Sequence, residues 1–228
     1  MNNLEIIGEG ATTKVYRDGN VAIKMYVNPP PGEVESEAKL QSYAAKMRLP
    51  VPPVLGVRKV SESMTALDME YIAGKPLLHE GMDKDKRLAA IQTLIKLQCE
   101  IHAIDAHGLP SQKDRILQKI NRNNNIGANI KARLFALLDS LDVHANKLCH
   151  GDFHPLNILH DGKKHWIIDW VDATSGSPLA DACRTYIILK QYLLRLAGIY
   201  LRHFCKEAGT RQEDVLAWLP GNCGGTHV

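Results

Sequence analysis

The feature that most constrains the fold is a change of hydrophobic pattern near residue 74. Before it, short β-branched and aromatic runs alternate with glycines and an Asp-Gly turn, which predicts antiparallel strands. One segment there, Glu33–Met47, has apolar residues at helical spacing and predicts a single helix. Beyond Gly74-Lys75-Pro76, apolar stripes of helical period dominate. The pattern predicts an α+β chain, with a small antiparallel-sheet lobe at residues 1–73 and a larger, mainly helical lobe at residues 74–228.

The individual elements follow from these runs. Strands are expected at Leu4–Ile7, Lys14–Arg17, Val21–Tyr26, Val51–Val60 and Met64–Ile72. A further hairpin is expected around Asp161-Gly162, which has apolar runs on both sides. The later helices are expected at Arg87–Ile104, Arg133–Leu141, Leu179–Phe204 and Glu213–Leu219.

Composition argues against several classes of protein. A net charge of +3 and few aromatic residues give no basis for nucleic-acid binding. No apolar run reaches the roughly eighteen residues that span a membrane, and Met1–Glu9 lacks the basic and apolar regions of a signal peptide. The five cysteines stand singly, which argues against a disulfide framework. We therefore expect a cytoplasmic protein; nothing in the sequence bears on its oligomeric state.

Residues typical of phosphoryl transfer gather in His150–Asn157 and at the end of the apolar run Trp166–Ile168. That reaction needs a carboxylate to orient and deprotonate a hydroxyl, and oxygen ligands that hold magnesium on the phosphates. Asp152, Asn157 and Asp169 supply this set. The step from Asp152 to Asn157 equals that in the catalytic loop of protein kinases, where a later aspartate is the second magnesium ligand.

The same loop allows another interpretation, a zinc site of a metal hydrolase. Its ligands would come from His150, Asp152, His154 and His160, helped by Cys149. A zinc site would not explain the presence of Asn157 and Asp169, so this alternative is the weaker one.

Near the N-terminus, Gly8 and Gly10 lie between two expected strands. Missing side chains there allow backbone amides to approach the phosphates of a nucleotide. The match to the glycine-rich loop of kinases is partial, because Thr13 stands where that pattern has its third glycine.

Lys24 strengthens the interpretation as a phosphate-covering loop. It ends the run Val21–Ile23, at the position of the kinase lysine that reaches the α- and β-phosphates. Such a lysine needs a carboxylate that fixes its direction. Glu37 is the favoured partner, and Glu33, one turn earlier on the same helix face, remains an alternative.

With these residues in view, the sequence resembles the aminoglycoside phosphotransferase and choline kinase superfamily, whose members have a bilobal, protein-kinase-like fold. The resemblance covers about Leu4 to Pro220. The residues that support it are His150–Asn157, Ile168-Asp169-Trp170, Asp172, Gly176, Pro178 and Asp181.

The resemblance implies an ATP- and magnesium-dependent kinase that phosphorylates a hydroxyl of a small molecule. It implies that Asp152 is the base, that Asn157 and Asp169 bind magnesium, and that Met69–Ile72 form the adenine-binding hinge, with Glu70 and Ile72 among its residues. Trp170 follows Asp169 where protein kinases have phenylalanine, which favours a small-molecule substrate over a protein.

Two further features bear on the acceptor and on turnover. Many relatives continue in another helix where this chain has Gly221–Val228, so the acceptor pocket is expected to be open or incomplete there. This segment and Thr13 motivate an alternative function, a kinase-like module that binds nucleotide with little or no turnover.

Charge in the late helices bears on the identity of the acceptor. Every formal charge from Arg184 through Lys206 is positive. An aminoglycoside is a polycation that needs carboxylates around it, so a neutral or anionic hydroxylated metabolite is favoured. The same charges are equally compatible with the solvated outer faces of packed helices.

Overall fold

The computed structural model describes residues 4–10, 13–141 and 145–219. The chain divides into two compact units. The first, here called the N-terminal unit, comprises Met1–His79 and Leu156–Asp172; the second, called the helical unit, comprises Glu80–Pro155 and Ala173–Val228.

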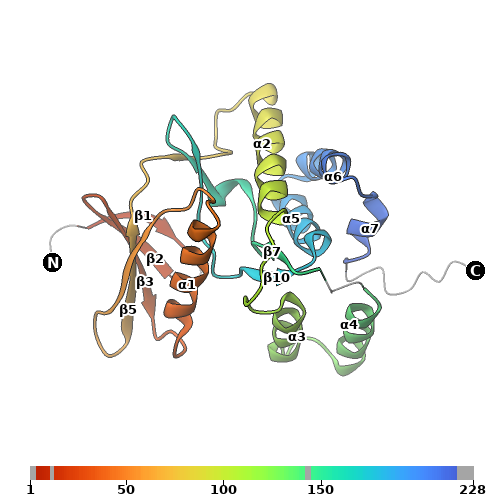
Figure 1. Ribbon diagram of the computed structural model, residues 1–228, viewed down its shortest axis with the longest axis horizontal. Coiled ribbons are helices and arrows are strands. Elements are labelled where there is room, and N and C mark those ends of the chain that lie inside the picture. Colours follow the sequence, from red (N-terminus) through yellow and green to blue (C-terminus); the bar gives the residue numbers. More distant parts are fainter. Residues whose placement is uncertain (1–3, 11–12, 142–144, 220–228) are drawn as a thin grey trace, which may run out of the picture. The chain divides into compact units, whose positions relative to one another are not determined.

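A five-stranded antiparallel sheet forms most of the N-terminal unit, with strand order β1-β2-β3-β5-β4 (Figure 1). Its strands are β1 (Glu5–Glu9), β2 (Thr13–Asp18), β3 (Val21–Val27), β4 (Val54–Lys59) and β5 (Met64–Glu70). The turn between β2 and β3 contains Gly19 at φ 57°, a left-handed conformation that suits glycine. The small antiparallel-sheet lobe predicted from the sequence is therefore present.

One helix, α1 (Glu33–Lys46), packs against β4 and β5. It begins after the proline run, with Gly32 at its N-cap and Glu33 and Glu35 in its first turn, where acids interact favourably with the helix dipole. Its buried residues are Val34, Glu37, Leu40, Gln41 and Ala44. Their helical spacing places a carboxylate, that of Glu37, on the face that packs against the sheet.

A three-stranded sheet brings residues from the middle of the chain into the same unit. Its order is β6-β8-β9, from β6 (Lys75–Pro76), β8 (Ile158–His160) and β9 (His165–Ile167). Gly74 precedes β6, where an added Cβ would lie 3.0 Å from the backbone oxygen of His160. This close approach favours glycine at position 74. Pairing with β6 explains why Leu156–Asp172 belongs to the N-terminal unit, whereas the sequence-based division at residue 74 assigned it to the later lobe.

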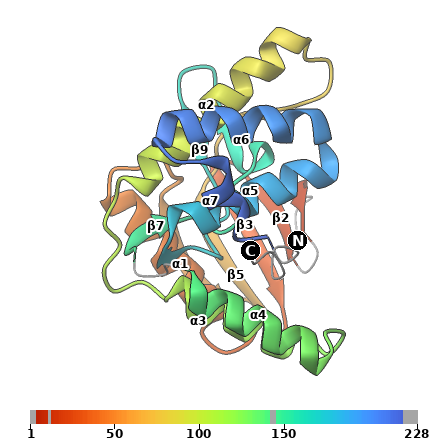
Figure 2. The same ribbon diagram turned by 90° about the vertical axis from the view of Figure 1, so that its right-hand side faces the viewer.

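The helical unit is built around three long helices. They are α2 (Lys84–His102), α5 (Pro178–Tyr192) and α6 (Leu194–Ala208), and α6 packs against both of the others (Figures 1 and 2). Tyr200 and Phe204 of α6 are completely buried among them. The shorter elements are α3 (Gln112–Arg122), α4 (Ala128–Ser140), α7 (Gln212–Leu216), the strands β7 (Lys147–Cys149) and β10 (Thr174–Gly176), and the 3₁₀ turn η1 (Pro155–Asn157), which crosses the boundary between units.

Three features of the helical unit differ from the sequence-based expectation. Helix α3 was not expected, although Ile116 and Ile120 have helical spacing and the Ser111 side chain accepts a hydrogen bond from the Asp114 amide as an N-cap. The apolar run expected as helix from Leu179 to Phe204 is interrupted at Leu193, which has the non-helical angles φ −143° and ψ 55°. The antiparallel pair β7–β10 was missed because each strand has only three residues.

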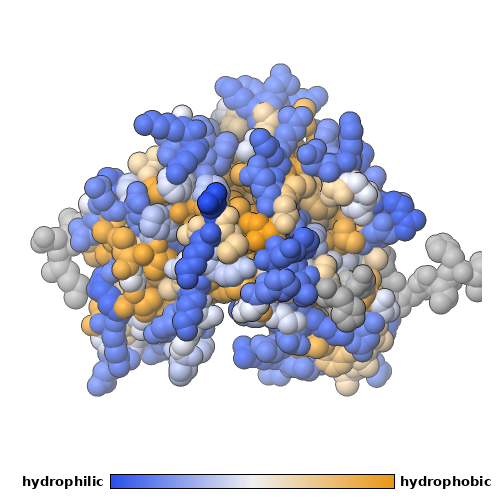
Figure 3. Space-filling model, viewed as in Figure 1, coloured by the Kyte–Doolittle hydropathy of each residue, from blue (hydrophilic) through white to orange (hydrophobic). Residues whose placement is uncertain are grey.

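No helix in the described ranges is long and apolar enough to cross a membrane. On the face drawn in Figure 3, hydrophilic residues are interspersed with hydrophobic ones. Cys99, Cys149, Cys183 and Cys205 are free thiols. Cys223 and the C-terminal segment Gly221–Val228 lie outside the described residues.

Candidate active site

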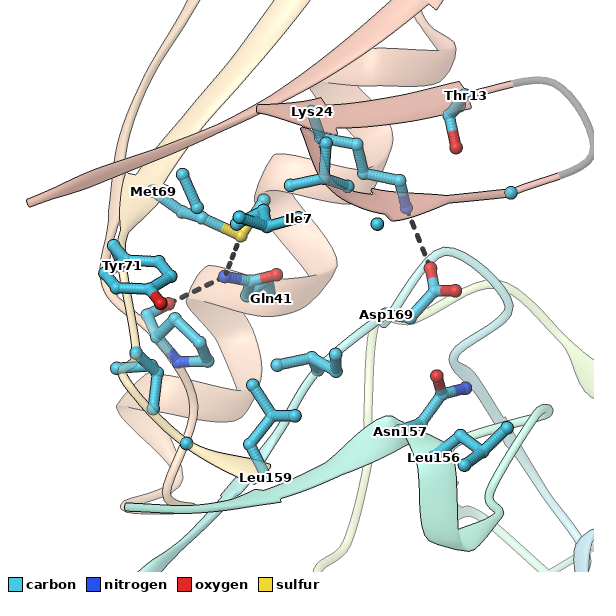
Figure 4. A pocket seen from close by; sticks show the side chains of 18 of the residues that line it. Ile7, Thr13, Lys24, Gln41, Met69, Tyr71, Leu156, Asn157, Leu159 and Asp169 are labelled. Carbon is cyan, nitrogen blue, oxygen red and sulfur yellow. Dashed lines mark hydrogen bonds and ion pairs between the residues drawn. The ribbon is translucent and has the colours of Figure 1, made fainter. Parts of the chain in front are cut away.

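A cavity of about 480 Å³ in the N-terminal unit brings most of the predicted site residues together. This volume falls within the range of about 300–1,000 Å³ typical of ligand pockets. Residues from the β1–β2 hairpin, β3, α1, the segment after β5, and the β8–β9 region all line it (Figure 4). Of the predicted residues, those in its wall are Gly8, Gly10, Lys24, Glu37, Glu70, Ile72, Asn157 and Asp169.

Lys24 is the cation of this cavity. Its position on β3, paired with Val15 and Leu67 across the sheet, directs the side chain into the cavity. The ammonium lies 2.7 Å from Oε1 of Glu37. It lies 2.8 Å from Oδ1 of Asp169, a contact that Figure 4 shows. Burial alone would lower the pKa of Lys24, but the two carboxylates outweigh it and raise the pKa, so the lysine is charged at neutral pH.

Glu37 is the acid that the structure places beside Lys24, and its side chain is only 1% exposed. The phenol of Tyr26 on β3 donates a hydrogen bond to its other carboxylate oxygen. Burial and the nearby Glu37 carboxylate raise the pKa of Tyr26, so this donor stays protonated. The two bonds fix the carboxylate, and through it the direction of Lys24.

Asp169 lies beyond β9, at φ 65°. This left-handed conformation is uncommon for a residue other than glycine, although aspartate tolerates it better than most. Such strained positions cluster at functional sites. The next residue, Trp170, is fully buried and donates its indole N–H to the carbonyl of Ile167. The buried indole anchors the backbone beside Asp169.

Asn157 faces the same cavity from the end of η1 (Figure 4). The backbone carbonyl of Asn157 accepts a hydrogen bond from the backbone amide of Ile168 at 3.0 Å, which ties the turn to the segment leading into Asp169. The cavity thus contains a carboxylate and a carboxamide, oxygen donors of the kind that magnesium prefers when it is also bound to phosphates. The donor set fits the predicted metal.

The remaining predicted residue, Asp152, belongs to the helical unit. It follows β7 in the loop that begins at His150, and Gly151 before it has φ 82°. The Gly151 amide donates to Oδ1 of Asp181 at 2.7 Å, while Thr185 donates its hydroxyl to the carbonyl of Phe153 at 2.8 Å. The loop is therefore held to α5 on both sides of Asp152.

Asp181 itself is a fully buried carboxylate in the first turn of α5. His102, at the end of α2, lies 2.9 Å from its Oδ2, and the His150 amide donates to the same oxygen at 3.3 Å. Burial would raise the pKa of Asp181, but hydrogen bonds from His102 and the Gly151 amide hold it below its usual 3.8. The charged carboxylate joins α2, α5 and the Asp152 loop.

Basic side chains surround the carboxylate of Asp152. Nε2 of His154 lies 3.5 Å from Oδ2, and Nη2 of Arg184 donates to Oδ1 at 3.2 Å. Contact with His154 is the main cause that lowers the pKa of Asp152, and the charge of Arg184 contributes. Asp152 is therefore ionised at neutral pH, the state that a proton acceptor requires.

The predicted zinc site does not assemble in the part of the chain that the structure describes. The metal-binding geometry found there joins Cys149 to His102 and Asp181, without His150, His154 or His160. Asp181 already accepts backbone amides, and burial raises the pKa of Cys149 well above its usual value, so its sulfur stays a thiol.

Sequence reasoning assigned no role to three residues that define the Asp152 surroundings. Asp181 was noted only through the family resemblance, Arg184 only as one of several charges, and His102 not as a site residue. The signal for Asp181 was a carboxylate in the otherwise apolar start of α5, since a buried charge requires partners.

Several solved structures that are similar to this chain are aminoglycoside phosphotransferases. A thermostable mutant of APH(4)-Ia, in a ternary complex with ADP and hygromycin B, is 17% identical with a TM-score of 0.71, over 96% of this chain and 83% of that one. An aminoglycoside-3'-phosphotransferase of type VIII is 18% identical with a TM-score of 0.73, over 97% and 93%. APH(3'')-Id from Streptomyces rimosus is 18% identical with a TM-score of 0.69, over 95% and 92%.

At such low identity these likenesses establish the fold alone, and they confirm the predicted kinase-like fold. No curated protein sequence matches the chain. The model of the phosphotransferase enzyme family matches residues 3–217, nearly the whole chain. The chain therefore belongs to the phosphotransferase enzyme family.

Proposed function

We propose that this protein transfers the γ-phosphoryl group of ATP to a hydroxyl of a small molecule, with Asp152 as the general base. The observation that supports this most is the group formed by Lys24, Glu37 and Asp169 in the cavity of the N-terminal unit. A charged lysine fixed between two carboxylates, beside a glycine-containing hairpin, is suited to bind phosphates. The chain also belongs to the phosphotransferase enzyme family.

The nucleotide would occupy this cavity. Lys24 would contact the phosphates, the Gly8–Gly10 strand end would cover them, and the backbone from Met69 to Ile72 would receive the base. ATP is proposed because similar structures are named as complexes with ADP and AMP-PNP. Another is a GDP and kanamycin complex, so both ATP and GTP should be tested.

Magnesium is proposed as the cofactor because Asn157 and Asp169 supply suitable oxygen donors to the cavity. When bound, the ion would neutralise charge on the phosphates and orient them. Lys24 holds one oxygen of Asp169 at 2.8 Å and thereby orients its carboxylate.

In the reaction, the acceptor oxygen forms a bond to the γ-phosphorus, and the bond from that phosphorus to the β–γ bridging oxygen breaks, releasing ADP. The proton of the acceptor hydroxyl passes to the carboxylate of Asp152, and then to solvent. Anchoring of the loop through Gly151 and Phe153 holds this carboxylate in place. Arg184 and His154 keep it ionised before the acceptor binds.

Other sequence-based expectations remain proposals. Residues 1–73 are proposed to hold the nucleotide, and residues 74–228 to supply the base, the metal ligands and the acceptor site. A cytoplasmic location is proposed from the single, unpaired cysteines.

Replacing Lys24 with alanine should lower kcat/KM by about 10²–10³-fold, the usual loss for one preorganised electrostatic group. It should also lower stability, because Glu37 is buried and would lose its cation. The matched control is Lys39→Ala, which removes an exposed lysine of α1. Steady-state kinetics and thermal unfolding measure the two effects; Lys24→Ala kinetics equal to those of the control would exclude a role in phosphate binding.

Replacing Asp169 with asparagine should remove the effect of magnesium on ATP affinity, because the carboxylate is the charged donor of the proposed metal site. Titration calorimetry with ATP, with and without magnesium, measures this difference. Asp68→Asn is the control, since its carboxylate pairs with Arg58 on the sheet. If magnesium strengthens ATP binding equally in wild type and Asp169→Asn, Asp169 is not a ligand.

Nucleotide consumption by the purified protein tests the proposed function directly. ADP and GDP release is measured with magnesium against a panel of hydroxylated metabolites and aminoglycosides. Stimulation by an acceptor supports the kinase. Saturable nucleotide binding with no stimulation by any acceptor would instead favour the alternative, a nucleotide-binding module with little or no turnover.

A further inference from the structure

Arg184 occupies an unusual position on α5. Its immediate neighbours on this helix, Cys183 and Thr185, are buried, whereas the Arg184 side chain is 49% exposed. Its guanidinium reaches the carboxylate of Asp152, with Nη2 3.2 Å from Oδ1. A permanently charged group thus stands in solvent beside the proposed base.

The Asp152 carboxylate does not need Arg184 to hold it in place. An ion pair with a half-exposed partner contributes little to stability. The Asp152 loop is already anchored to Asp181 and Thr185, and His154 contacts the other carboxylate oxygen. A guanidinium has five N–H donors in a planar fork, and the bond to Asp152 uses one of them.

Geometry limits what can approach the base. An acceptor hydroxyl must come within about 2.6–3.2 Å of the Asp152 carboxylate. A substituent on the carbon that bears this hydroxyl can then come within about 4–6 Å of the Arg184 guanidinium, the range in which neighbouring charges interact strongly. A carboxylate or phosphate there would be attracted, and an ammonium would be repelled.

The rest of the two helices offers little to a cationic acceptor. The exposed lysines and arginines on α5 and α6 are Arg184, Lys190, Arg195, Arg202 and Lys206. The acidic residues of these two helices are Glu207, near the end of α6, and Asp181, which is buried against His102. An amine-rich ligand near Asp152 therefore meets Arg184 without an exposed carboxylate from the neighbouring turns of α5.

We propose that Arg184 determines acceptor specificity by binding an anionic group, a carboxylate or a phosphate, close to the hydroxyl that is phosphorylated. This inference rests on the proposed function and names its substrate class: small hydroxylated anions. Arg184 offsets the negative charge of Asp152, which would otherwise repel such a substrate.

Matched acceptors that differ only in charge test the proposal. One set is glucuronate, glucose and 6-amino-6-deoxyglucose, and another is glycerate, glycerol and 3-amino-1,2-propanediol. The wild type should give the highest kcat/KM with the anion and the lowest with the amine. Arg184→Gln should lower the anion-to-neutral ratio by about 10–100-fold, the usual value of a charge-assisted hydrogen bond. Arg184→Lys should keep part of it, because lysine retains charge without the fork.

The control Arg202→Gln removes the same charge from an exposed site on α6 and should leave the ratio unchanged. An equal loss with all three charge states in Arg184→Gln would show that Arg184 only positions Asp152, and would overturn the proposal. A wild-type protein with a higher kcat/KM for the amine than for the anion would also overturn the proposal.

A binding measurement separates this inference from the proposed function. If no acceptor is phosphorylated, the proposed function fails. The role of Arg184 is then decided by the NMR signal of its side-chain Nε–H group. This signal is assigned by its loss in the spectrum of Arg184→Lys. Glucuronate or glycerate should shift this signal saturably, and the neutral and amino analogues should not. No shift with either anion would contradict the inference.

Discussion

Asp152→Asn is expected to lower kcat by about 10²–10⁴-fold, the usual contribution of a general base. An amide cannot accept the proton of the acceptor hydroxyl, and it would present an N–H group to Arg184 or His154, which also donate. ATP affinity should be unchanged, because Asp152 is absent from the cavity of Lys24 and Asp169. Steady-state kinetics and ATP titration measure the two quantities.

The matched control is Asp139→Asn, an exposed aspartate of α4 that pairs with Lys113. If Asp152→Asn retains a kcat near that of this control, Asp152 is not the base.

The pH dependence gives an independent check on Asp152. A base acts in its ionised form, and its lowered pKa keeps it ionised down to pH values below its usual 3.8. Asp152 should therefore cause no loss of kcat/KM between about pH 5 and 8. His154→Gln should raise the pKa of Asp152, since contact with His154 is the main cause of its lowering. The acid limb of the profile should then move to higher pH.

Asp181→Asn is expected to lower the free energy of unfolding by about 3–5 kcal/mol, because a hydrogen bond to a buried charged group contributes about 1.5–3 kcal/mol and the change disturbs more than one of them. Its carboxylate accepts hydrogen bonds from groups on α2 and in the Asp152 loop, and an amide nitrogen in place of one oxygen would face a donor. Chemical denaturation measures the loss, with Asp139→Asn as the control. A loss below about 1 kcal/mol, typical of exposed ion pairs, would contradict this role.

The effect of Asp181 on stability should also depend on pH in a defined direction. The pKa of Asp181 is lowered on folding, so its stabilising contribution is present above the unfolded pKa near 3.8 and is lost as pH falls through the folded value. The difference in stability between wild type and Asp181→Asn should therefore shrink as the pH falls below about 4. A difference that grows with acid would assign the stabilisation to another group.

The sequence predicted structure best where a functional residue lies within a regular hydrophobic pattern. Strands β2, β3 and β5 and helix α1 follow from residue periodicity, and Glu37 was favoured because its spacing places it on the buried face of α1. The grouping of Lys24 with Asp169 joins residues 145 positions apart. Only the family spacing of the motifs suggested it, because periodicity carries no information on contacts so distant in sequence.

The surroundings of Asp152 were harder to predict. In the late helices, Arg184 is one of five lysines and arginines whose side-chain direction cannot be predicted from the sequence. An exposed arginine on a helix has the same local pattern whether it faces solvent or a neighbouring loop. The anchor Asp181 acts on amides about 30 residues earlier in the chain. The short strands β7 and β10 have too few residues to leave a periodic signal, whereas the apolar residues of α3 lie at helical spacing but are few among many polar ones.

The most direct test of phosphoryl transfer to an acceptor hydroxyl follows the phosphorus atoms themselves. ³¹P NMR of the protein with ATP, magnesium and an acceptor that stimulates ADP release should show a phosphate monoester signal growing in step with ADP. The signal should couple to the protons of one acceptor carbon, and its rate of appearance should fall in Asp152→Asn as kcat does. Inorganic phosphate as the sole product, or an ester formed equally fast by Asp152→Asn, would contradict the account.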